Sequence, residues 1–163
     1  MLLSSLRFEK LSPRHRSEVI DIYNYYVLND TSAFNASVLS DGDYDLFMQR
    51  SKTAYAILLN DKTIGFCTLG NFLGFSAFDK TATLSLYIDP VYTAKGYGSI
   101  ALDKLECDAR RLGINSLVSI VSSDNEASLN FHLKNGFAES GYLDGVGEKF
   151  GKNFGLVYMQ KVL

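Results

Sequence analysis

The stretch from Leu84 to Phe137 constrains the fold more than any other part of the chain. It opens with an apolar segment typical of a strand, Leu84–Ile88, and continues into a glycine-rich turn, Lys95–Ser99, that precedes a long helical pattern. Backbone N–H groups at the start of a helix are unpaired donors, and the helix dipole adds positive potential there. Because glycines let an anion approach such donors closely, the stretch predicts a site for a phosphate-bearing cofactor beside a strand.

Two common phosphate-binding motifs are excluded by the surroundings of this turn. Residues 96–101 match the dinucleotide pattern G-x-G-x-x-A, but Asp89–Lys95 separates the strand from Gly96. In the dinucleotide fold the glycines follow the strand directly. A Walker loop would need Gly-Lys-Ser or Gly-Lys-Thr after the turn, and the sequence has neither. Taken alone, the glycines are also compatible with a surface turn that binds nothing.

The rest of the chain predicts an α+β fold with a mixed, mostly antiparallel central sheet flanked by helices. A tight turn at Asn60–Lys62 indicates a hairpin, and Ser40 and Ser123 are expected to cap helices. Residues 145–151, interrupted by glycines, are expected to form a loop. Strands are expected at 4–10, 54–59, 63–69, 81–88, 117–121, 137–142 and 154–163, and helices at 13–28, 41–50, 97–112 and 124–135.

The length of 163 residues and a net charge of −2 are typical of a single soluble domain, expected to span residues 1–163. This charge gives no indication of a nucleic-acid or membrane partner. The chain has neither a long apolar run nor a signal peptide, so we expect a cytoplasmic protein. Cys67 and Cys107 lack metal-ligand spacing and are expected to be reduced thiols, with no metal site. His15, Lys134, Lys149 and the charged residues of 103–111 are expected at the surface, although either lysine could meet a phosphate.

Two motifs together identify a family that the chain resembles. Thr93–Gly98 is similar to the pyrophosphate loop [Arg/Gln]-x-x-Gly-x-[Gly/Ala] of the GNAT superfamily of acetyl-CoA-dependent N-acetyltransferases, with Thr93 in place of Arg or Gln. The second motif of that superfamily, Asn-x-x-Ser…[Tyr/His]-x-x-x-Gly-Phe, is matched by Asn125, Ser128, His132, Gly136 and Phe137.

Shorter segments along nearly the whole chain narrow the resemblance to the phosphinothricin/methionine-sulfone acetyltransferase group. These segments are Ile22–Asn24, Val27–Asn29 with Thr31 and Phe34, Tyr87–Pro90, Lys149–Gly151 and Leu156–Gln160.

The resemblance implies the GNAT acyltransferase fold, acetyl-CoA as co-substrate and direct attack of an amine on its thioester. Main-chain groups of Leu86, Tyr87 and Ile88 are expected to bind the pantetheine arm like an added strand. One of their N–H groups would polarise the thioester carbonyl. The side chain of Asn125 is expected to contact the cofactor. The residues expected to surround the pyrophosphate are Ala94, Lys95, Gly96, Tyr97, Gly98 and Ser99.

The resemblance also assigns two catalytic positions. His132 stands where many members of the superfamily carry a Tyr acid, so it is a candidate for proton transfer or cofactor contact. A helix histidine that only packs is the alternative. Thr83 stands where the phosphinothricin group has a general-base Glu, and a hydroxyl cannot serve as that base. Water, Glu148 or deprotonation in solution would have to replace it.

The acceptor implied by the resemblance is a small amine, an amino acid or an analogue. Phe34, Phe75 and Phe78 are candidates to contact it. Leu73 and Phe75 stand where the group tends to carry arginines, which favours a less charged, more apolar amine. Relatives form homodimers, so a homodimer is expected here. Two other functions stay open: a non-catalytic acyl-CoA-binding protein and an acetyltransferase that acts on protein amines.

Overall fold

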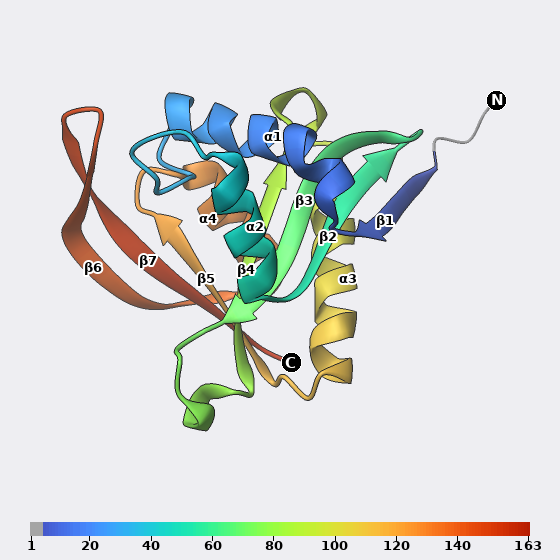
Figure 1. The fold of residues 1–163 in the computed structure, drawn as a ribbon. Helices are drawn as coiled ribbons and strands as arrows, with labels where there is room; N and C mark the ends of the chain where they lie inside the picture. The colour runs from blue at the N-terminus through green and yellow to red at the C-terminus, as the bar shows by residue number, and fades with distance from the viewer. Residues whose placement is uncertain (1–4) are drawn as a thin grey trace.

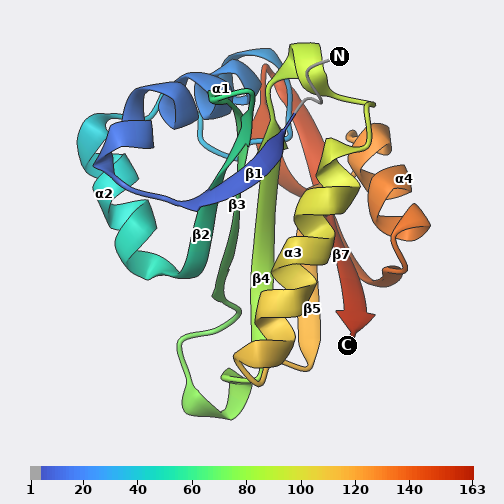
Figure 2. The same ribbon diagram turned by 90° about the vertical axis from the view of Figure 1, so that its right-hand side faces the viewer.

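The computed structural model describes residues 5–163 and shows a seven-stranded sheet between two pairs of helices. The strand order is β1-β2-β3-β4-β5-β7-β6, and β4 with β5 is the parallel pair in an otherwise antiparallel sheet. Helices α1 and α2 cover one face, and α3 and α4 lie on the other (Figure 2). The predicted α+β class is therefore confirmed.

The observed elements follow the predicted order. The predicted start of the first strand at Ser4 lies outside the described residues. The helices are α1 (Arg16–Asn29), α2 (Asp41–Arg50), α3 (Tyr97–Arg111) and α4 (Glu126–Lys134), and short 3-10 turns cover Pro13–His15, Ser76–Phe78 and Pro90–Tyr92. The strands are β1 (Leu6–Lys10), β2 (Ser51–Leu59), β3 (Lys62–Asn71), β4 (Thr81–Ile88), β5 (Ser116–Ser122), β6 (Ala138–Lys149) and β7 (Lys152–Val162).

The hairpin between β2 and β3 forms where the sequence predicts it. Asn60 and Asp61 both have positive φ, at 49° and 68°, the backbone conformation that a tight turn between twisted strands requires. Asn and Asp tolerate this region better than other side chains. The turn chemistry therefore fixes the register of β2 against β3.

Helix α3 packs against the sheet through a stripe of apolar residues. Leu102, Leu105 and Ala109 follow helical spacing and are buried beneath β4. Leu112, predicted to share this face, is 55% exposed. The prediction was wrong there because the helix ends at Arg111 and the chain turns away.

The prediction of a loop over residues 145–151 was also wrong. Strand β6 continues to Lys149, and the hairpin that it forms with β7 projects from the body of the molecule (Figure 1). Gly147 serves cross-strand packing, since a Cβ there would clash with the ring of Phe154 on β7. The turn itself is Phe150–Gly151, where both residues have positive φ.

Several ionisable side chains predicted at the surface are buried. Glu106 lies 2.5 Å from Lys161, and Asp108 accepts hydrogen bonds from Tyr55 (2.6 Å) and Lys104 (2.7 Å). Each has a partner on a strand far away in the sequence, which a helical charge pattern cannot reveal. Both cysteines are free thiols, as predicted, with Cys67 buried and Cys107 exposed.

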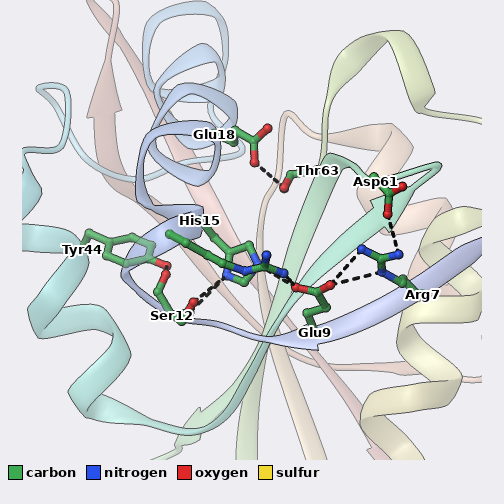
Figure 3. A network of polar contacts seen from close by, with 9 residues as sticks. Arg7, Glu9, Ser12, His15, Glu18, Tyr44, Asp61 and Thr63 are labelled. Atoms are coloured by element: carbon green, nitrogen blue, oxygen red, sulfur yellow. Dashed lines mark hydrogen bonds and ion pairs between the residues drawn. The ribbon is translucent and has the colours of Figure 1, made fainter.

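His15 is buried as well, at 3% exposure, inside a polar network at the start of α1 (Figure 3). Its Nδ1 accepts from the Ser12 N–H (3.2 Å), so its Nε2–H donates to Glu9 (3.2 Å). Glu9 in turn pairs with Arg7 and Arg14. Burial and the nearby Arg14 lower the pKa of His15. The network anchors α1 to β1.

Candidate active site

The divergence of β4 and β5 creates the main cleft. Their pairing covers only Thr81–Thr83, after which the two strands separate (Figure 1). Beyond that point β4 is paired only with β3, and β5 only with β7. The open cleft has a volume of about 1850 Å³ and is lined by both strands, by α1 and α2, and by parts of α3 and α4.

Main-chain groups of β4 face this cleft in alternation. The Asp89 N–H donates to Ile64 O (2.8 Å). In an antiparallel pair every second residue is hydrogen-bonded to the partner strand, so the main-chain groups of Tyr87, two residues earlier, are bonded to β3 as well. Those of Leu86 and Ile88 face away from β3. The sequence predicts that Leu86, Tyr87 and Ile88 all bind the pantetheine arm. Main-chain groups of Leu86 and Ile88 are placed to do so, whereas those of Tyr87 are bonded to β3.

The turn before α3 presents free donors, as the sequence predicts. Gly96 has φ +86°, and the first helical bond runs from the Ile100 N–H to Gly96 O (3.3 Å). The N–H groups of Tyr97, Gly98 and Ser99 therefore have no partner within the helix. These residues, with Ala94 and Gly96, line the cleft. Lys95 is not part of this lining and donates to Val91 O (2.9 Å).

Gly98 has a second reason to lack a side chain. A Cβ there would lie 3.2 Å from the ring of Phe131 on α4. The glycine thus lets α4 pack closely against the turn, in addition to keeping the backbone accessible. Sequence reasoning assigned it to the pyrophosphate alone.

Asn125 is the residue that caps α4, two positions after the predicted Ser123. Its Oδ1 accepts from the Ser128 N–H (3.1 Å), and its Nδ2 donates to Ser32 Oγ (2.8 Å). Asn125 lines the cleft. These two hydrogen bonds hold the loop after α1 against α4. One lone pair of Oδ1 and one hydrogen of Nδ2 remain to bind a ligand.

His132 lies in the wall of the cleft with a defined tautomer. Its Nδ1 is 2.7 Å from Ser128 O, which can only accept, so Nδ1 carries the proton. Its Nε2 is buried and has no partner among residues 5–163. The ring packs edge-on against Phe131 and Phe137. Burial lowers the pKa of His132, so the ring is neutral at pH 7 and Nε2 offers a lone pair.

Thr83 lies in the cleft at the last position where β4 pairs with β5. Its hydroxyl donates to Asn71 O (3.3 Å). The cleft is lined by two carboxylate residues from the described chain, Asp30 and Asp43. Glu148, which the sequence left open as a base, is exposed on the β6–β7 hairpin and is not part of the lining.

A cluster of aromatic residues joins α1 to β4 at the acceptor side. Tyr87 stacks on Phe66 and donates to Ser32 O (2.9 Å), while Tyr26 donates to Ile88 O. Burial raises the pKa of Tyr26 to about 12, and burial also raises the pKa of Tyr87. Both phenols are therefore protonated and hydrogen-bonded, which makes them structural donors rather than bases.

Lys149 is buried beneath this wall, contrary to the prediction. Its ammonium donates to Asp30 O (2.7 Å), Ala33 O (2.8 Å) and Tyr26 O (3.4 Å). Burial lowers its pKa, and Asp30 opposes that effect. A residue from the C-terminal hairpin thus fixes the end of α1 and the loop that follows it.

The three predicted substrate contacts do not come together. Phe34 lines the cleft and stacks on Phe154 at 6.2 Å between ring centroids. Phe75 and Phe78 do not line it, because their loop between β3 and β4 extends beyond the end of the sheet (Figures 1 and 2). Phe75 is 71% exposed. Of the three predicted residues, Phe34 alone lines the cleft within a single chain.

The residues present fit acetyl-CoA. Two open strand edges suit a narrow arm with amide groups, and free N–H groups at a helix start suit its pyrophosphate. Within residues 5–163, no cluster of three or more His, Cys, Asp or Glu side chains could hold a metal ion. No helix within these residues has the length and apolarity needed to cross a membrane.

Comparison with known proteins assigns this arrangement to a family. The acetyltransferase (GNAT) family matches residues 19–137. An L-amino acid N-acyltransferase of Escherichia coli (strain K12) is 31% identical over 146 residues, which cover 87% of this chain and 85% of that protein. An L-methionine sulfoximine/L-methionine sulfone acetyltransferase of Salmonella typhimurium is 30% identical over the same shares of the two chains.

The fold is shared with a solved structure that contains acetyl-CoA. The Salmonella typhimurium protein yncA, solved with its cofactor acetyl-CoA, superposes with a TM-score of 0.91 at 26% identity. The match covers 98% of this chain and 95% of that one.

Proposed function

The chain belongs to the acetyltransferase (GNAT) family and is an N-acetyltransferase that uses acetyl-CoA, and on that premise we propose that it acetylates the amine of a small amino acid or analogue. Relatives at 30–31% identity act on L-amino acids and on L-methionine sulfoximine or sulfone. The proposal extends that substrate class to this protein.

The observation that carries the proposal is the end of β4–β5 pairing at Thr83. It leaves a cleft that both substrates can enter, with the free donors of α3 near one end of β4 and the aromatic wall of α1 along one side. Acetyl-CoA supplies an acetyl thioester for direct attack by the amine. The main contribution of the protein is to hold the two reactants in register, which can lower the barrier by several kcal/mol.

Each part of the cleft then has a task. The N–H groups of Tyr97, Gly98 and Ser99 bind the pyrophosphate, and main-chain groups of Leu86 and Ile88 hold the arm that carries the thioester. A β4 N–H directed into the cleft stabilises negative charge on the carbonyl oxygen. Phe34 and the aromatic residues of α1 enclose the acceptor.

His132 acts as a hydrogen-bond acceptor in this scheme. Its Nε2 carries the lone pair, so the ring cannot donate a proton from that atom at neutral pH. This differs from the Tyr acid that the resemblance suggests for the position. With Thr83 unable to act as a base, the amine loses its proton to water in the open cleft.

The assembly is part of the proposal. We propose that residues 1–163 form one domain that assembles as a homodimer, a state that light scattering coupled to size exclusion would measure. A mass of about one 18.1 kDa chain would contradict the dimer without affecting the proposed chemistry.

The experiment is acetyl-CoA turnover, followed by the release of free thiol, with a panel of L-amino acids, L-methionine sulfone, alkylamines and a peptide. Turnover of amino acids above alkylamines and peptide is expected. Tight acetyl-CoA binding without turnover of any amine would favour the non-catalytic binding protein, and preference for the peptide would favour a protein acetyltransferase.

A further inference from the structure

Arg50, the last residue of α2, is the feature of the cleft that the proposed function leaves unused. Five of the six arginines form ion pairs with carboxylates, and Arg50 forms none with any residue of 5–163. Its side chain is exposed and lines the cleft. A guanidinium presents parallel N–H donors that match the two oxygens of a carboxylate.

The register of the sheet places Arg50 close to Thr83. Ser51, the next residue, pairs with Gly70 on β3, and Gly70 pairs with Thr83 on β4. Neighbouring strands lie about 4.8 Å apart, so about 10 Å separate the backbones of Ser51 and Thr83. An extended arginine and a small ligand together can fill that span.

The surface between these two residues is open and faces the acceptor side. Ala82 and Leu84 belong to the core beneath α3, so Thr83 points to the opposite face, which α1 and α2 cover. Gly70 has no side chain, and a Cβ there would lie 3.2 Å from Thr83 Oγ1. The missing side chain leaves room for a ligand between Arg50 and Thr83.

The anion that Arg50 meets is not the pyrophosphate. Thr83 and Ile88 are about 17 Å apart along β4, at about 3.3 Å per residue, and the donors of α3 follow Ile88. Lys134, the other cation of the lining, lies at the end of α4 on the far face of the sheet (Figure 2). Among residues 5–163, Arg50 is therefore the one cation of the lining at the acceptor end.

We propose that Arg50 binds the α-carboxylate of the acceptor and so selects α-amino acids over simple amines. This inference rests on the proposed function and deepens it. The amine and the carboxylate of an α-amino acid share one carbon, so a carboxylate held over Gly70 leaves the amine beside Thr83. The side chain of the acceptor extends elsewhere in the cleft, where it meets Phe34 and the other aromatic residues.

The test compares the best α-amino acid of the panel with its carboxamide, which keeps the amine and loses the negative charge. Arg50→Met should raise the KM of the amino acid about tenfold or more and change that of the carboxamide less than about twofold. Arg50→Lys should lie between the wild type and Arg50→Met, because charge remains but the paired donors are lost. Lys134→Met, the matched control, should leave the KM ratio of the two substrates unchanged.

Stability and acetyl-CoA affinity, measured by thermal unfolding and calorimetry, establish that Arg50→Met is folded. An unchanged KM for the amino acid, or an equal rise for both substrates, would overturn the role of Arg50 and leave the proposed function in place. A wild type that binds acetyl-CoA and acetylates neither substrate class would overturn the proposed function, and this inference with it.

Discussion

The two halves of the cleft are built in different ways. The cofactor half uses main-chain groups of β4 and of the turn before α3, all within residues 84–99. The acceptor half is assembled from side chains and loops far apart in the sequence. Lys149 holds the loop after α1, Asn125 binds Ser32 in that loop, and Arg50 enters from α2.

This difference explains why a sequence motif can specify one half and not the other. A turn that binds phosphate through N–H groups needs glycines and a helix start, which are local features. A wall made of distant side chains depends on packing between elements and leaves no local pattern. Mutations should therefore act on cofactor binding through single residues of the turn, and on acceptor binding through distant residues that support the wall.

The largest effect is expected at the turn. Ser99→Glu places a carboxylate in the first turn of α3, where negative charge suits the helix dipole, so stability should not fall. The same charge would repel the pyrophosphate and weaken acetyl-CoA binding by roughly 100-fold. Calorimetric titration with acetyl-CoA measures this change. Ser99→Gln, similar in size and neutral, is the control, and equal affinity of the two variants would refute the assignment of the turn.

The second effect tests the support of the acceptor wall. Lys149→Met removes a buried ammonium that donates to three main-chain carbonyls, so the free energy of unfolding should fall by about 2 kcal/mol. Lys152→Met, at an exposed position in the same hairpin, should change it by less than about 0.5 kcal/mol. Urea unfolding measures both variants.

Kinetics separate this role from general destabilisation. In folded Lys149→Met the KM of the amine should rise more than the dissociation constant of acetyl-CoA, because the loop at residues 30–34 lines the acceptor side. An equal rise in the KM of the amine and in the dissociation constant of acetyl-CoA would mean that Lys149 supports both halves of the cleft, contrary to this prediction.

The sequence predicted what depends on local chemistry. The hairpin at Asn60 follows from turn residues that tolerate positive φ, and α3 follows from its apolar spacing and the glycine before it. His15 and Lys149 were predicted at the surface, because the partners that satisfy their polar atoms lie on other elements. The glycines at 145, 147 and 151 indicated a loop, since the Phe154 ring that packs against Gly147 cannot be seen in a linear pattern.

A third, smaller effect concerns the chemistry near the cofactor. His132→Phe keeps a ring against Phe131 and Phe137 but removes the lone pair of Nε2, and kcat should fall about tenfold with acetyl-CoA affinity within about twofold. Protonation of the amine substrate lowers the rate of both proteins as the pH falls, and because burial lowers the pKa of His132, protonation of the ring should add a further decline in the wild type below pH 6.5. The variant should lack that further decline, and identical pH–rate profiles would remove His132 from the mechanism.

The smallest effect compares the two histidines in stability. Burial lowers the pKa of both His15, beside β1, and His132, in the cleft, so the unfolded chain binds protons near pH 6.5 that the folded chain does not. Stability should therefore fall as the pH drops from 7.5 to 5.5. His132→Phe should reduce that fall more than His15→Gln, because both Glu18 and the Ser12 backbone oppose the pKa shift at His15, whereas the Ser128 backbone alone opposes it at His132. Urea unfolding at the two pH values measures the difference, and a wild type equally stable at both would contradict the buried neutral state of the two rings.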